Sequence, residues 1–167
     1  MKTFLTGFLM AIVIPPVLVF LFFRLGFADV QADVRPPAWE SRVLFAAVHH
    51  SVARQAAGIV MPGAATEERL VRGGKLFMNG CAGCHGELGK PFGEDHTNYP
   101  PVPQLPHIGT QYTEPQIYWV VKHGVRMTAM SAYGRFYSEE ELWSIAAFVR
   151  QIRNLPVGVQ ERILAKP

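Results

Sequence analysis

The residues Cys81-Ala82-Gly83-Cys84-His85 constrain this chain more than any other part of its sequence. Two thiols three positions apart at the end of a helix can reach two vinyl groups on one edge of a porphyrin and form thioether bonds with them. The histidine that follows then lies where its imidazole can bind the porphyrin iron. The spacing therefore predicts one covalent c-type haem held by Cys81, Cys84 and His85.

Other readings of the two cysteines fit less well. A structural zinc ion usually needs four protein ligands, and the chain has only two cysteines and no histidine pair at zinc-finger spacing. A dithiol redox motif is expected within alternating strands and helices, which this sequence does not indicate. A disulfide between Cys81 and Cys84 stays open as an alternative.

Length and charge limit the number of domains and the classes of function that this chain can have. The 167 residues suffice for one domain and an appendage. The chain has 16 Lys and Arg and 13 Asp and Glu, which gives a net charge of +3. Two of the basic residues, Lys2 and Arg24, flank an apolar segment, so the rest of the chain has 14 basic and 13 acidic residues. Nucleic-acid binding needs a strongly basic surface, so we expect no nucleic-acid partner.

Residues 4–23 form an uncharged run of twenty residues between Lys2 and Arg24. A helix of about 20 apolar residues crosses a hydrocarbon core of roughly 30 Å, so residues 1–28 are predicted to be a transmembrane anchor. A cleaved signal peptide, cut after Gly26-Phe27-Ala28, is the alternative, but its apolar run would be shorter. Pro15 and Pro16 should kink the helix, and neighbouring helices of a membrane complex would accommodate that kink.

Residues 29–65 are predicted to be two linkers around an amphipathic helix. The helix should run from Trp39 to about Gly58, with apolar residues at four-residue spacing. It either packs on the following domain or lies at the membrane surface. His49 and His50 in this helix are expected to be structural or solvent-facing, rather than ligands of a second, non-covalent haem, because no further ligand pattern accompanies them.

Three further helices are indicated by their capping residues. Thr66 is a suitable N-cap for a helix that ends near Asn79, just before the cysteines. Thr113 with Gln116 forms a capping box for a short helix that stops at Gly124. Ser138 with Glu141 forms a second capping box, for an amphipathic helix that reaches about Asn154.

The run GGKLFMNGCAGCHG resembles the N-terminal helix and haem site of class I cytochromes c. In that family, the residues matching Gly73 and Phe77 pack against the C-terminal helix, at positions that match Ile145 and Phe148 here. The resemblance covers about Thr66 to Leu155. It implies an all-α class I cytochrome c fold, with N- and C-terminal helices packed crosswise around one haem, over residues 66–155. Residues 156–167 are then expected to be a C-terminal tail.

The resemblance also implies further haem contacts. Pro103-Gln104-Leu105 is similar to the family's Pro-Asn-Leu, so the Pro103 carbonyl should accept the Nδ1 hydrogen of the iron-bound imidazole, although Pro101 and Pro106 are close in sequence. Leu105 is expected to pack on the haem face. Trp119 is expected in the core, where it could donate to a haem propionate. His96 and His107 are expected to be loop residues rather than ligands.

The second axial ligand is expected to be a methionine. Met130-Ser131-Ala132-Tyr133-Gly134 is similar to the family's Met-Pro-Ala-aromatic-Gly, which favours Met130 over Met127. The predicted iron ligands are therefore His85 and Met130. Ser131 stands where the family commonly has proline, and this difference leaves the stiffness of the loop open.

An iron atom with histidine and methionine on its two sides has no free position for a substrate. The predicted function is therefore one-electron transfer without catalysis, by a single-pass protein of the cytoplasmic membrane. Its haem domain should lie on the periplasmic side, because the family receives haem there. The chain would be a tethered carrier between respiratory or photosynthetic redox proteins. The alternative is a haem c subunit of an integral membrane oxidoreductase complex.

Overall fold

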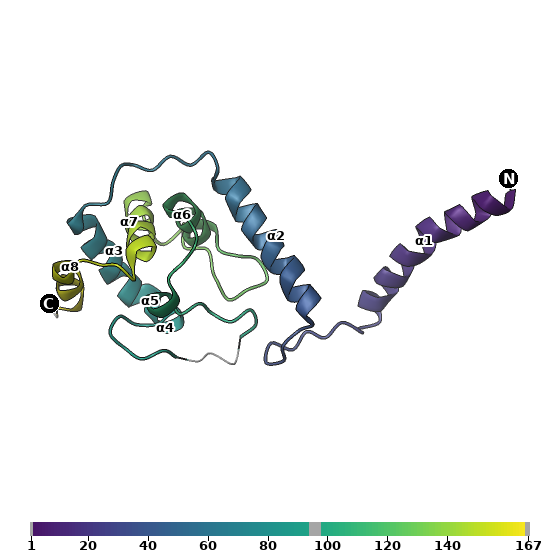
Figure 1. Ribbon diagram of the computed structural model, residues 1–167, viewed down its shortest axis with the longest axis horizontal. Coiled ribbons are helices and arrows are strands. Elements are labelled where there is room, and N and C mark those ends of the chain that lie inside the picture. Colours follow the sequence, from purple (N-terminus) through teal and green to yellow (C-terminus); the bar gives the residue numbers. More distant parts are fainter. Residues whose placement is uncertain (1, 94–97, 166–167) are drawn as a thin grey trace.

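The computed structural model describes residues 2–93 and 98–165, and these residues contain helices and no strand. The long helices are α1 (Lys2–Arg24), α2 (Ala38–Ala56), α3 (Glu67–Gly80), α6 (Glu114–His123) and α7 (Glu139–Gln151). The short ones are α4 (Ala82–His85), α5 (Leu105–Ile108) and α8 (Val157–Leu164). Figure 1 shows α3 to α8 gathered in one body, with α1 apart from it.

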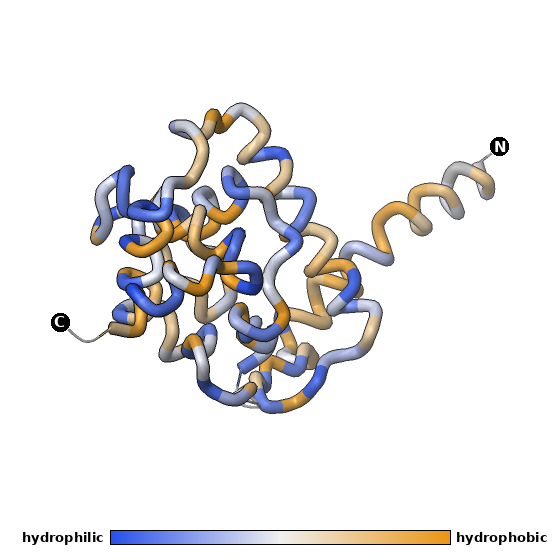
Figure 2. Tube along the Cα trace, turned by 60° about the vertical axis from the view of Figure 1, so that its left-hand side comes forward, coloured by the Kyte–Doolittle hydropathy of each residue, from blue (hydrophilic) through white to orange (hydrophobic). Residues whose placement is uncertain are grey.

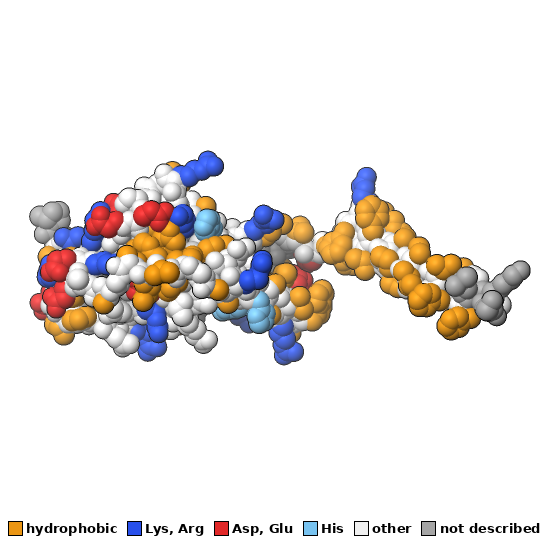
Figure 3. Space-filling view, turned by 90° about the horizontal axis from the view of Figure 1, so that it is seen from above, with side chains coloured by type: hydrophobic (Ala, Val, Ile, Leu, Met, Phe, Trp, Pro, Cys, Tyr) orange, Lys and Arg blue, Asp and Glu red, His pale blue; other side chains and the backbone are white. Residues whose placement is uncertain are grey.

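Helix α1 is apolar along its length and lies outside the packed body. Its segment Thr6–Arg24 is the one helix of the described chain that is long and apolar enough to cross a membrane. Figure 2 shows its hydrophobic residues, and Figure 3 shows apolar side chains over much of its surface. Arg24 lies in its last turn. The helix continues without interruption through Pro15 and Pro16.

The centre of the body is the contact between α3 and α7. Helix α3 begins as predicted, because the Thr66 side chain accepts a hydrogen bond from the Arg69 amide at 3.2 Å. Gly73 leaves room for the α7 backbone, since a Cβ atom added there would lie 1.9 Å from the Ser144 carbonyl oxygen. One turn further on, the rings of Phe77 and Phe148 pack with their centroids 5.2 Å apart. The predicted pairing of the two helices is confirmed, with its closest approach at Ser144.

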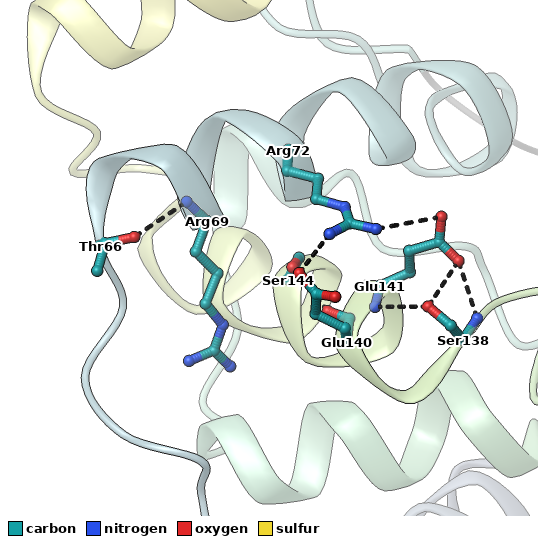
Figure 4. A network of polar contacts seen from close by, with 7 residues as sticks. All are labelled: Thr66, Arg69, Arg72, Ser138, Glu140, Glu141 and Ser144. Carbon is teal, nitrogen blue, oxygen red and sulfur yellow. Dashed lines mark hydrogen bonds and ion pairs between the residues drawn. The ribbon is translucent and has the colours of Figure 1, made fainter.

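Polar side chains hold the start of α7 against α3 (Figure 4). The Ser138 amide donates to the Glu141 carboxylate at 2.8 Å, and the Glu141 amide donates to the Ser138 hydroxyl at 3.3 Å, which confirms the predicted capping box. Arg72 of α3 pairs with Glu140 and lies 3.7 Å from Glu141. Helix α7 ends at Gln151, slightly earlier than predicted, and continues as a turn.

Helix α6 covers another side of α7. The ring of Tyr118 stacks on that of Trp143 at 4.2 Å, and Arg69 joins α3 to both elements by donating to Glu114 at 2.8 Å and to the Trp143 carbonyl at 3.0 Å. The prediction that Trp119 belongs to the core is wrong. Trp119 is half-buried, because the face of α6 that meets α7 carries Ile117, Tyr118 and Val121.

Helix α2 packs on the domain, which is one of the two arrangements expected for it from the sequence. Val52 is 1% exposed and Ala56 is also buried, where the C-terminal half of α2 meets α6. The ring of His49 lies 5.0 Å from that of Tyr112, so His49 contacts the domain.

The expected C-terminal tail is a helix over most of its length. Helix α8 packs against α3, with Val159 and Ile163 buried. The reason lies in α3: Gly74 has no side chain, and Ile163 occupies the space where a Cβ atom of residue 74 would be. The packed domain therefore extends beyond Leu155 to Leu164.

Candidate haem site

The two cysteines and His85 lie on a tight helical turn that follows α3 directly. The Cys81 amide closes α3 by donating to the Phe77 carbonyl at 2.8 Å. The amides of Cys84 and His85 then both donate to the Cys81 carbonyl, at 3.1 and 2.9 Å. Gly86 ends this turn, α4, with φ 87°, a value that glycine adopts without strain. The position of the three side chains is thus set by the end of α3, which α7 holds in place.

The His85 ring is oriented by a backbone carbonyl. Its Nδ1 atom lies 3.0 Å from the Pro103 oxygen. A carbonyl only accepts, so Nδ1 is the donor and the lone pair of the neutral ring is at Nε2. Burial lowers the pKa of His85, against the opposing effect of the bond to Pro103. Burial therefore favours the neutral form of the ring, in which the contact with Pro103 places the lone pair on Nε2, the nitrogen that can bind a metal.

Gln104 connects this segment to the cysteine turn, through a contact that no sequence pattern predicted. Its buried side chain donates from Nε2 to the Cys84 carbonyl at 2.9 Å. Its Oε1 atom lies against Gly86, where an added Cβ atom would be only 2.7 Å away. Gln104 thereby contacts the two residues next to His85 in sequence, Cys84 and Gly86.

The two thiols differ in their surroundings. Cys81 is partly buried and packs on the hydrophobic core, whereas Cys84 is exposed. Burial, with a smaller contribution from Cys84, raises the pKa of Cys81 to about 11. Both sulfur atoms are free of a disulfide, so both thiols are available for covalent chemistry.

Residues 125–134 form a loop that is held in shape by hydrogen bonds. The Val125 amide donates to the Met130 carbonyl at 3.0 Å, and Thr128 lies between them, donating from Oγ1 to the Val125 carbonyl at 2.8 Å and accepting from the Met130 amide at 3.1 Å. Beyond Met130, the Tyr133 and Gly134 amides donate to carbonyls of α6, each at 3.0 Å. These bonds hold the loop without a proline at position 131.

The two candidate methionines are placed differently in this loop. Met130 is partly buried and packs on the hydrophobic core, as do Cys81 and Leu105. Met127 is 92% exposed and has φ 60°. Of the two thioethers, only that of Met130 belongs to the same packed cluster as the cysteine turn.

Trp119, and the histidines that were expected not to be ligands, make the following contacts. Trp119 contacts His123, with ring centroids 5.1 Å apart. His107 lies in α5 beside Phe92, at 5.5 Å between ring centroids, and its Nε2 atom is buried with no hydrogen-bond partner among the described residues. His50 is exposed on α2, and His96 lies outside the described residues.

The donor set fits a c-type haem. It offers two unpaired thiols, a neutral imidazole with Nε2 free and a partly buried thioether, together with the apolar side chains of Ala82 and Leu105. These are the groups that attach haem, bind its iron from two sides and keep its surroundings apolar. The hydrogen bond from His85 to Pro103 is also the kind of contact that orients a metal-bound imidazole.

The helical fold and this site together define the class: the body of the protein is a cytochrome c domain with the class I fold. Residues 68–149 match the family model described as cytochrome C oxidase, cbb3-type, subunit III. Comparisons with curated proteins and with solved structures gave no significant match. A cytochrome c domain implies haem and haem-based electron transfer.

Proposed function

We propose that this protein transfers one electron at a time through a single haem c, bound covalently to Cys81 and Cys84. In the bound state the haem supplies an iron atom that is oxidised and reduced by one electron. His85 and Met130 would bind the iron, so that no position is left for a substrate. Leu105 and Trp119 would line the haem, and the Pro103 carbonyl would keep the His85 ring in its orientation.

The observation that carries this proposal is the contact between His85 Nδ1 and the Pro103 carbonyl at 3.0 Å. It fixes the imidazole in the tautomer that leaves Nε2 for a metal, on the turn that presents both thiols. A structural disulfide or a dithiol redox motif would not require this orientation. The exposed Cys84 also marks the side of the domain where a redox partner would approach, as electron transfer needs only close contact of the two proteins.

Helix α1 bears on where in the cell the protein would act. We infer that α1 anchors the chain in the cytoplasmic membrane, with the cytochrome domain on the periplasmic side, where haem is attached in this class. The chain would be a tethered carrier between respiratory or photosynthetic proteins. A second candidate, a haem c subunit of a membrane oxidase complex, is favoured by the family whose model residues 68–149 match.

Haem content tests the proposal directly. Full-length protein purified in detergent from cells that mature c-type cytochromes should contain one haem per chain in a pyridine haemochrome assay. The pigment should stay with the polypeptide in acidified butanone. Colourless protein, or pigment that is fully extracted, would refute covalent haem. Cys84→Ser and Cys81→Ser should each leave at most one thioether bond, visible as a shifted haemochrome maximum.

Native mass spectrometry of gently extracted membranes separates the two candidates. A carrier should be recovered as the single chain with one haem. A subunit should be recovered in a complex of fixed stoichiometry with other membrane proteins.

A further inference from the structure

Helix α2 is apolar on two opposite sides, and only one of them is docked. The docked side carries Val48, Val52 and Ala56, and it is held at its start by a hydrogen bond between the hydroxyl groups of Ser41 and Tyr99. Together with the contact between His49 and Tyr112, these interactions fix both halves of α2 to the domain. The helix therefore cannot turn its other side inward.

The opposite side presents an exposed row of side chains that we call the outer row: Trp39, Val43, Ala47 and His50. At 100° per residue these positions lie along one face, roughly opposite Val48 and Val52. Trp39 is 66% exposed and Val43 is 59% exposed, and no described part of the chain covers them. In Figure 3, hydrophobic and basic side chains lie next to one another at the end of the body nearest α1, where α2 begins (Figure 1).

The charge around the outer row and the length of the linker before α2 indicate which surface contacts the outer row. Between residues 35 and 56 the chain has three arginines, Arg35, Arg42 and Arg54, and a single acidic residue, Glu40. All three arginines are exposed. The linker from Arg24 to Ala38 can span at most about 50 Å, so the start of α2 stays close to the end of the anchor. Tryptophan at the start of a basic, half-apolar helix is typical of helices that lie in the membrane interface.

We propose that the outer row of α2 lies in the headgroup region of the lipid bilayer that α1 spans. Trp39 and Val43 contact the upper acyl chains, and the flanking arginines pair with lipid phosphates. Because α2 is fixed to the cytochrome domain, this contact holds the domain in one orientation above the membrane instead of leaving it free on its linker. The inference rests on the proposed anchoring by α1.

Photo-crosslinking tests the contact in the full-length protein. Val43→p-benzoylphenylalanine places a photoreactive ring in the outer row, and Val157→p-benzoylphenylalanine places one at an exposed valine on α8 as the matched control. Each variant is reconstituted in vesicles of phosphatidylethanolamine and phosphatidylglycerol, floated on a density gradient and irradiated. Lipid adducts on the peptide are then measured by mass spectrometry.

The expected result is a several-fold excess of phospholipid adducts at position 43 over position 157 in vesicles that carry the protein. Protein that floats but shows equal adducts at both positions overturns the membrane contact and leaves the anchor intact. Protein that does not float overturns the anchor and this inference together. If irradiated native membranes instead give an adduct with another protein at position 43 and no lipid adduct, the outer row is a protein interface and the proposal fails.

Discussion

Gly73 and Ser144 approach so closely that the backbone of α7 occupies the place of a side chain on α3. A Cβ atom at position 73 would lie 1.9 Å from the Ser144 oxygen and 2.4 Å from its carbonyl carbon. Neither atom can move without displacing α7. The glycine therefore determines how near the two helices come, and with it the position of the cysteine turn at the end of α3.

Gly73→Ala should accordingly destabilise the domain by about 3 kcal/mol or more, because the clash is with backbone atoms in a packed core. Gly158→Ala is the matched control, since nothing lies within 4 Å of its added Cβ atom in helix α8. That variant should be neutral or stabilised by up to about 1 kcal/mol through helix propensity. Urea denaturation followed by circular dichroism measures both, and similar stabilities would contradict the close packing.

Ile163→Ala should show that α8 belongs to the domain. Removing this buried side chain opens a cavity beside Gly74 and should cost about 2–5 kcal/mol. Leu164→Ala, at the neighbouring exposed position, should change the free energy of unfolding by less than about 0.5 kcal/mol. Equal effects of the two substitutions would indicate that residues 157–164 do not contribute to the core.

Met130→Ala should remove the absorption band at the far-red end of the ferric spectrum that sulfur ligation produces, and lower the reduction potential. A thioether favours reduced iron, so its loss favours the oxidised form. Met127→Ala is the natural control, because that side chain is exposed in the same loop. Loss of the band in Met127→Ala, with the band retained in Met130→Ala, would assign the ligand to the other methionine.

Thr128→Val should weaken the loop while leaving its shape nearly unchanged. The substitution removes the hydroxyl group that bonds both the Val125 carbonyl and the Met130 amide. The net loss for such a hydrogen bond is typically about 1 kcal/mol. If Met130 binds the iron, added imidazole then displaces it more easily, and the affinity of imidazole for the iron should rise about fivefold. Spectroscopic titration of the ferric protein with imidazole provides the measurement. An unchanged affinity would mean that Thr128 does not help to hold Met130.

Acid should remove part of the stability of α7. Hydrogen bonds from the Ser138 amide and hydroxyl lower the pKa of Glu141, and Arg72 contributes further. The carboxylate therefore stabilises the folded state above its ordinary pKa, and this contribution is lost as the pH falls through the lower folded pKa. The difference in free energy of unfolding between the wild type and Glu141→Ala should be constant near neutrality and shrink below about pH 4.5. A difference that persists in acid would contradict this origin.

The parts of the fold that were predicted correctly depend on local signals. Capping residues such as Thr66 and Ser138 act on amides three positions away, so their effect is visible in the sequence. The pairing of α3 with α7 came from the family resemblance at Gly73 and Phe77. The contact between His85 and Pro103 was likewise predicted from that resemblance, and the two atoms lie at hydrogen-bond distance.

The parts that were missed depend on contacts between distant segments. Helix α8 has only two buried apolar residues, Val159 and Ile163, too few for a recognisable period, and the space that Ile163 fills belongs to Gly74. The bond from Gln104 to Cys84 joins a side chain to a backbone carbonyl twenty positions away. No pattern of residue types encodes such a bond. Trp119 was expected in the core, but which side of α6 is buried depends on how this helix sits on α7.

The bond between Val125 and Met130 closes their loop on itself, and within the loop the Thr128 side chain bonds to both of its ends. Arg126 and Met127 are both exposed at the tip of the loop. Substitutions there would alter the surface offered to another protein and leave residue 130 where it is. The surface at the tip of the loop and the position of Met130 can therefore change independently, although the residues concerned are almost adjacent in sequence.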